Sequence, residues 1–142
     1  MSEQSSSVSR KTSVSSNPKP LWLRLLAELL GTGLLVFFGC ISALQFSGGD
    51  PWGKLIAVSA AFGIIVAALV YMIGGVSGAQ LNPAASLAMA IDKRISWKDF
   101  VCYSLAQIVG AFLGALVIWL FLGSAAGSLS STVVNNDALR GS

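Results

Sequence analysis

Residues 77–86, which read SGAQLNPAAS, decide the fold because they place the start of a helix between two long apolar runs. Asn82 is a favoured N-cap residue, Pro83 suits the first helical position, and Ala84 begins a run of small residues that continue a helix. Water normally receives such a helix start, because its first N–H groups have no partner within the helix. The sequence around this segment therefore determines where the helix begins and what its amino end can do.

The composition indicates a membrane protein. Of the 142 residues, 54% are hydrophobic and 11% are charged, against about 25% charged in soluble domains. Histidine is absent, and Cys40 and Cys102 lie in separate apolar runs, so neither a metal site nor a disulfide framework is indicated. Without histidine, paired carboxylates or a cysteine–base pair, we expect no enzyme, catalytic residue, metal or cofactor, and no nucleic-acid partner.

Three apolar runs, residues 21–46, 55–73 and 98–122, are long enough to cross a bilayer, which needs roughly twenty helical residues. The first could be a signal peptide, but its apolar core exceeds the usual length of about 7–15 residues, which favours an uncleaved span. Residues 1–20 are rich in serine and predict a disordered cytoplasmic tail. Residues 123–142 predict a polar carboxyl-terminal tail without a fourth span.

The distribution of basic residues predicts the orientation. Seven of them precede the first or the third span, and two lie in the other connections: Arg10, Lys11, Lys19, Arg24, Lys93, Arg94 and Lys98, against Lys54 and Arg140. Cytoplasmic segments carry the excess of lysine and arginine. We therefore expect an integral protein of the cell (plasma) membrane with a cytoplasmic amino terminus.

Residues 76–91 enter and leave the membrane from one face in this topology. A helix over residues 83–91 would rise about 13 Å at 1.5 Å per residue, roughly half of a 30 Å hydrocarbon core. The sequence thus predicts an all-α membrane protein with three transmembrane helices and one re-entrant half-helix. An amphipathic linker on the membrane surface is the alternative, but the segment is apolar and rich in glycine.

The non-helical backbone of Gly78, Ala79, Gln80 and Leu81 would then lie at membrane depth, where it must pack in protein or line a wet cavity. Its carbonyls offer acceptors, whereas Asn82 and the positive end of the half-helix offer donors. Such a path suits a small neutral hydroxylic solute and disfavours protons and cations.

These segments resemble the aquaporin and glycerol-facilitator (major intrinsic protein) family. SGAQLNPAAS is similar to its first Asn-Pro-Ala box, usually written SGAH-x-NPAVT. Three further stretches resemble its first three spans in order: AELLGTGLLVFFGC, SAAFGIIVAALVYMIGGVSGA and YSLAQIVGAFLGA. The resemblance covers about residues 21–122 and implies an aquaporin-like half that passes water or small neutral solutes such as glycerol.

The resemblance also implies roles for individual residues. The Asn-Pro-Ala box is Asn82, Pro83 and Ala84, and the row of backbone carbonyls that lines the path belongs to Gly78, Ala79, Gln80 and Leu81. Phe62 matches a selectivity position, and Glu28 and Gln107 match buried polar residues that brace the loop. Two alternatives stay open. Glu28 could reach the interface beside Arg24, one turn away, and Phe62 could be ordinary apolar packing.

The sequence departs from the family at several positions. Gln80 replaces a histidine, Ala85 and Ser86 replace Val-Thr, and only the first of two inverted halves is recognisable. We expect a channel polypeptide that is incomplete as a lone chain and works in the lipid bilayer with a second channel half or as a homo-oligomer. A parallel oligomer would leave Glu28 uncovered. The alternative is a non-transporting anchor or regulatory module.

The third span carries small residues at four-residue spacing, Ala106, Gly110 and Gly114. Small residues so placed allow close approach of helices in membranes. They could pack against the first span or form a contact between protomers.

Overall fold

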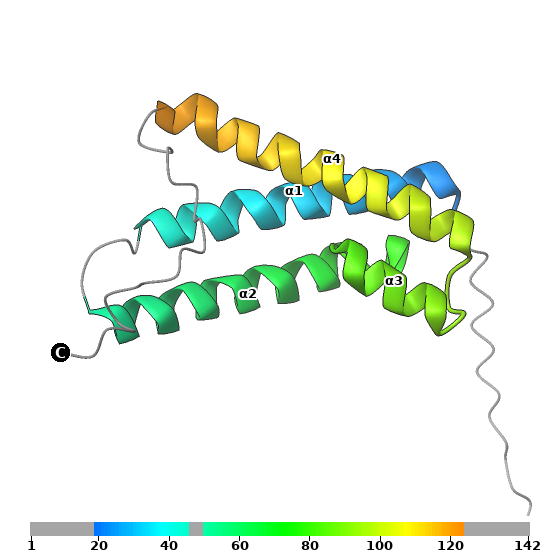
Figure 1. The fold of residues 1–142 in the computed structure, drawn as a ribbon, viewed down its shortest axis with the longest axis horizontal. Helices are drawn as coiled ribbons and strands as arrows, with labels where there is room; N and C mark the ends of the chain where they lie inside the picture. Colours follow the sequence, from blue (N-terminus) through cyan, green and yellow to red (C-terminus); the bar gives the residue numbers. More distant parts are fainter. Residues whose placement is uncertain (1–18, 46–49, 124–142) are drawn as a thin grey trace, which may run out of the picture.

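The structure, a computed structural model, describes residues 19–45 and 50–123. Within these ranges the chain forms four helices and no strand: α1 (Leu21–Gln45), α2 (Pro51–Ser77), α3 (Pro83–Ile91) and α4 (Trp97–Leu122). Figure 1 shows the short α3 near the end of α2 and the start of α4. All three long helices are long and apolar enough to cross a membrane, so the predicted all-α membrane fold is confirmed. The predicted tails lie almost entirely outside the described residues.

Helix α2 is longer at both ends than the apolar run predicted for it. It begins at Pro51, where the Asp50 carboxylate caps the helix by accepting a 2.8 Å hydrogen bond from the Gly53 N–H. It ends where Gly78 takes a left-handed conformation with φ of 94°, and the Gly78 N–H donates to the Gly74 carbonyl. Hydropathy alone missed both ends because capping, and not apolar content, sets them.

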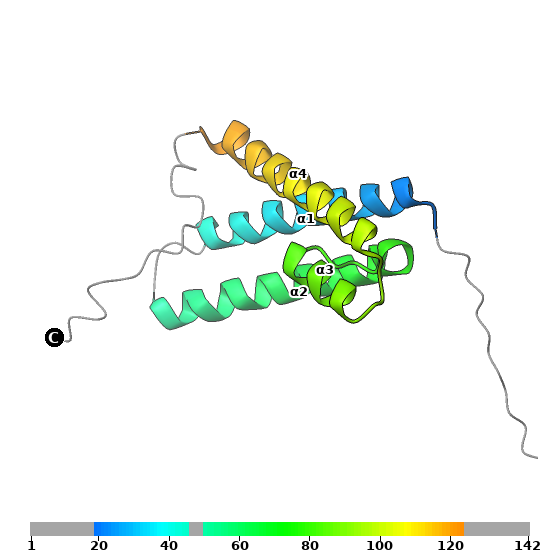
Figure 2. The same ribbon diagram turned by 45° about the vertical axis from the view of Figure 1, so that its right-hand side comes forward.

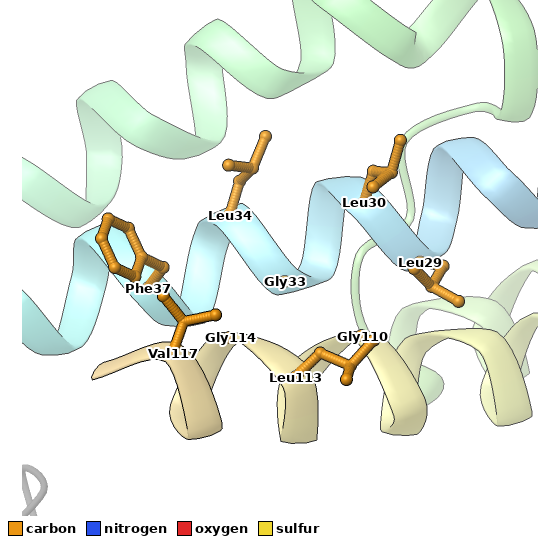
Figure 3. Close-up of a pocket in the computed structure, with 9 residues that line it drawn as sticks. All are labelled: Leu29, Leu30, Gly33, Leu34, Phe37, Gly110, Leu113, Gly114 and Val117. Carbon is orange, nitrogen blue, oxygen red and sulfur yellow. The ribbon is translucent and has the colours of Figure 1, made fainter. Parts of the chain in front are cut away.

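Helices α1 and α4 pack with their backbones in contact. A β-carbon at Gly110 would meet the carbonyl oxygen of Leu29, and one at Gly114 would meet that of Gly33. Figure 3 shows Gly33 facing Gly110 and Gly114 along this seam, beside an apolar crevice of about 290 Å³. Glycines therefore serve the contact between the first and third spans.

Helix α3 starts after the chain has turned back from the end of α2. It packs against α4, and two of its residues, Ser86 and Ala90, are buried. Figures 1 and 2 show its carboxyl end running toward the end of the bundle where α4 begins. The half-helix therefore enters and leaves from the same end.

Candidate functional site

The loop between α2 and α3 has an unusual backbone conformation. Gly78, Ala79 and Leu81 all have positive φ, of 94°, 49° and 55°. Each left-handed residue other than glycine costs about 1–2 kcal/mol, so contacts elsewhere must hold the loop in place. One is local, since the Ala79 N–H donates a 3.1 Å hydrogen bond to Ser77 Oγ.

The carboxylate of Glu28, on α1, supplies the main support for this loop. Its Oε1 accepts a 3.0 Å hydrogen bond from the Gln80 N–H, and its Oε2 accepts a 2.7 Å bond from the Leu81 N–H. Gln107 Nε2 donates to the same Oε2 at 2.8 Å. Glu28 is 0% exposed, so a buried carboxylate with three charge-assisted hydrogen bonds fixes the loop.

This geometry excludes the open alternative for Glu28 and corrects one expectation about it. The side chain does not extend to the interface beside Arg24, because Arg24 pairs instead with Asp99 at 3.3 Å. The expectation that Glu28 would be left uncovered without an opposing half is also wrong. Within this one chain, donors from the loop and from α4 satisfy its carboxylate.

Ser86 joins α3 to the same buried cluster. Gln107 Nε2 donates to Ser86 Oγ at 3.0 Å, and the Ser86 hydroxyl lies 3.4 Å from Gln107 Oε1. Both side chains are 0% exposed. Sequence analysis treated Ser86 only as a replacement for threonine. Its position as a polar residue inside an apolar half-helix was the signal that could have found it.

A second set of polar contacts, also absent from the sequence analysis, lies nearer the end of the bundle. The buried Tyr103 hydroxyl donates a 3.0 Å hydrogen bond to the carbonyl oxygen of Ser77, at the end of α2. Arg24 forms the ion pair with Asp99. Asp99, Tyr103 and Gln107 recur every four residues on α4, so they share a helix face, and this spacing could have predicted a polar face on α4 but not its partners.

Asn82 caps α3 as its residue type predicts. Its Oδ1 accepts a 2.8 Å hydrogen bond from the Ala84 N–H, and Pro83 is the first helical residue. Asn82 is exposed, and its amide nitrogen makes no hydrogen bond within the described part of the chain. The amino end of α3 therefore presents free N–H groups and a partial positive charge beside that amide.

Phe62 lies apart from this cluster. Its ring, 36% exposed, rests on Gly39 of α1, where an added β-carbon would meet the ring. Glu28 and Gly39 are on the same helix and are separated by about 16 Å at 1.5 Å per residue. The structure therefore places Phe62 well away from the loop, with the tip of its ring against α1 and part of the side chain exposed.

Three apolar spans and a half-helix held by a buried carboxylate define a helical membrane protein with a re-entrant segment. The family model described as Major intrinsic protein matches residues 15–141. The chain therefore belongs to this family, which is one of membrane channel proteins and not of enzymes.

Several curated relatives are similar to this chain. Aquaporin-5 of Mus musculus is 39% identical over 116 residues, which cover 81% of this chain and 43% of that protein. Aquaporin Z of Rhodopseudomonas palustris is 41% identical over 105 residues, 73% of this chain and 44% of that protein. The propanediol uptake facilitator PduF of Citrobacter freundii is 40% identical over 101 residues, 70% and 37% respectively. The chain thus spans less than half the length of these three relatives.

Proposed function

We propose that this chain forms part of a channel for water or small neutral solutes, in which the amino end of α3 and the loop before it line the path. The observation that carries the proposal is that the Asn82 side chain uses only its amide oxygen as the helix cap. This side chain caps the half-helix through Oδ1 and leaves its amide group exposed and free to donate.

The cap fixes the direction of the Asn82 amide. Because Oδ1 accepts from the Ala84 N–H, the opposite side of the amide carries both free N–H groups. A solute oxygen that reaches this point meets donors, and the loop carbonyls of residues 78–81 supply acceptors. The positive end of α3 opposes the entry of protons and cations, so the proposed solute is neutral and hydroxylic.

Phe62 is proposed as the constriction that sets the size of the solute. The tip of the ring lies against Gly39 and the side chain is partly exposed, which is compatible with a position in a pore wall. The relatives are named as aquaporins and as a propanediol uptake facilitator. These names support a substrate class of water and small polyols.

The channel is proposed to need a second, inverted half. The described part of the chain contains one half-helix, and inverted repeats of this kind meet at the bilayer midplane. Because Glu28 is satisfied within this chain, the second half is required for the wall of the path and not for the stability of the polar cluster. The proposed orientation places the amino terminus in the cytoplasm.

Substitution of Asn82 tests the proposal in vesicles that contain the assembled channel. Asn82→Asp keeps an oxygen that can cap Ala84 but removes the amide donors, so we expect α3 to remain folded while water flux falls about tenfold or more. Gln45→Glu, the same chemical change at the exposed end of α1, is the matched control and should leave flux unchanged. Equal flux through both variants would contradict the proposed role of Asn82, whereas an unsubstituted assembly without flux would favour a non-transporting module.

A further inference from the structure

A polar cavity of about 520 Å³ opens at the end of the bundle where α1 and α4 begin. Residues from α1, from the connection after α3 and from the start of α4 contribute its polar wall: Arg24, Lys93, Arg94, Ser96, Trp97 and Asp99. None of these residues belongs to the loop, the half-helix cap or the proposed constriction. The cavity is therefore separate from the proposed path.

The wall carries more positive than negative charge. Three of its residues are cationic and only Asp99 is acidic. Asp99 pairs with Arg24 at 3.3 Å, and Arg94 pairs with Asp92, which lies outside the wall, at 2.6 Å. Even with Asp92 included, the site keeps a net positive charge, so an anion is the complementary ligand.

The connection that carries Lys93 and Arg94 has a defined backbone conformation. Lys93 has a left-handed φ of 59°, which costs about 1–2 kcal/mol for a residue with a β-carbon. The connection is nevertheless fixed, because the Lys93 N–H donates to the Ala90 carbonyl and the Arg94 N–H to the Met89 carbonyl.

The position of the cavity identifies a lipid as the source of the anion. α1 and α4 are apolar spans that begin at this end, and Trp97 is 60% exposed there, as expected for an indole at the headgroup level. An apolar groove of about 560 Å³ also lies between α1 and α4, lined in part by Trp22, Leu25 and Cys102. The groove shares no lining residue with the cavity, so the two are separate features of this end of the bundle.

We propose that this cavity binds the phosphate headgroup of an anionic phospholipid. Basic pockets between spans at the cytoplasmic side recognise such headgroups, and the proposed orientation places the cavity there. In this account, Lys93 and Arg94 provide the charge, and Trp97 holds the lipid at the interface. The site is independent of the proposed channel activity.

Native mass spectrometry of the full chain with added phosphatidylglycerol or phosphatidylcholine tests the site. We expect the protein to retain phosphatidylglycerol preferentially, and the exposed double substitution Lys93→Gln/Arg94→Gln to lower its retention by about tenfold or more. The matched control is Lys54→Gln/Lys98→Gln, which also removes two positive charges. Lys98 lies at the same end of the bundle as the cavity, but it is not part of the cavity wall. The control should retain the lipid, and circular dichroism should show equal helix content in both variants.

Three outcomes would overturn the proposal. Equal losses in the two double variants would show a diffuse charge effect without a site. Equal retention of the anionic and zwitterionic lipids would show that no anion is recognised. Displacement of phosphatidylglycerol by millimolar inorganic phosphate would show a site for a free anion, because a lipid held also by its acyl chain should stay bound.

Discussion

The Leu81 N–H donates a 2.7 Å hydrogen bond to Oε2 of Glu28, a residue 53 positions earlier in the chain. With the adjacent bond from the Gln80 N–H, it ties a strained re-entrant loop to the first third of α1. The loop conformation therefore depends chiefly on this one buried carboxylate. The exposed cap at Asn82 is positioned through this contact.

Replacing Glu28 should destabilise the protein. In Glu28→Gln, one carboxylate oxygen becomes an NH₂ group. This group cannot accept the hydrogen bonds that the loop N–H groups or Gln107 Nε2 donate to Glu28. We expect a loss of about 2–3 kcal/mol in the free energy of unfolding, the range for hydrogen bonds to a charged group. Denaturant unfolding in detergent, followed by circular dichroism, measures it.

The control for this prediction is Asp92→Asn. Asp92 is exposed, so the same chemical change should alter the free energy of unfolding by less than about 0.5 kcal/mol. Equal stability of the two variants would show that the carboxylate does not hold the loop.

A side chain at Gly110 should separate α1 from α4. The β-carbon of Gly110→Ala would meet the backbone carbonyl of Leu29, which cannot move without shifting the helix. We expect a cost of about 1–3 kcal/mol, the range for overpacking. Gly63→Ala on α2 is the control, because nothing lies within 4 Å of its added β-carbon. That variant should be neutral or more stable in thermal unfolding, and equal losses in both would contradict the described seam.

The local parts of this fold could be predicted from sequence. Asn82 and Pro83 mark the start of α3 by their residue types alone, since an N-cap depends on its immediate neighbours. The apolar runs located all three spans. The start of α2 was missed because Asp50 and Pro51 extend the helix beyond the apolar run.

The contacts between helices were harder to predict. Tyr103 meets Ser77, and Ser86 meets Gln107, only because particular faces of the helices are turned together. Periodicity can place polar residues on one face, but it cannot say which neighbouring helix that face meets. The importance of Glu28 and Gln107 came from the family resemblance and not from their spacing.

The size of the side chain at position 62 should set the selectivity of the assembled channel. Phe62→Ala removes the partly exposed ring beside Gly39, so we expect the ratio of glycerol to water flux to rise several-fold. Phe112→Ala, which removes an exposed ring from α4, should leave the ratio unchanged. Stopped-flow light scattering on vesicles measures both fluxes, and an unchanged ratio in Phe62→Ala would remove this residue from the wall.

Single cysteines test the orientation. Lys54 lies in the first turn of α2, Asp92 directly follows α3, and both are exposed. A single cysteine is placed at one or the other position after Cys40 and Cys102 are replaced by alanine. With a cytoplasmic amino terminus, an impermeant maleimide added outside cells should label position 54. It should label position 92 only after permeabilisation. Labelling of both positions from outside would exclude a re-entrant segment.

Osmotic water flux in vesicles that contain only this purified 142-residue chain tests the central claim that one half-helix does not complete the path. We predict flux no faster than through protein-free vesicles. Co-reconstitution with the carboxyl-terminal half of a relative such as aquaporin Z of Rhodopseudomonas palustris should produce rapid flux that Asn82→Asp abolishes. Rapid flux through the chain alone, with a low activation energy and loss in Asn82→Asp, would contradict the account, because copies of this chain would then complete a pore among themselves.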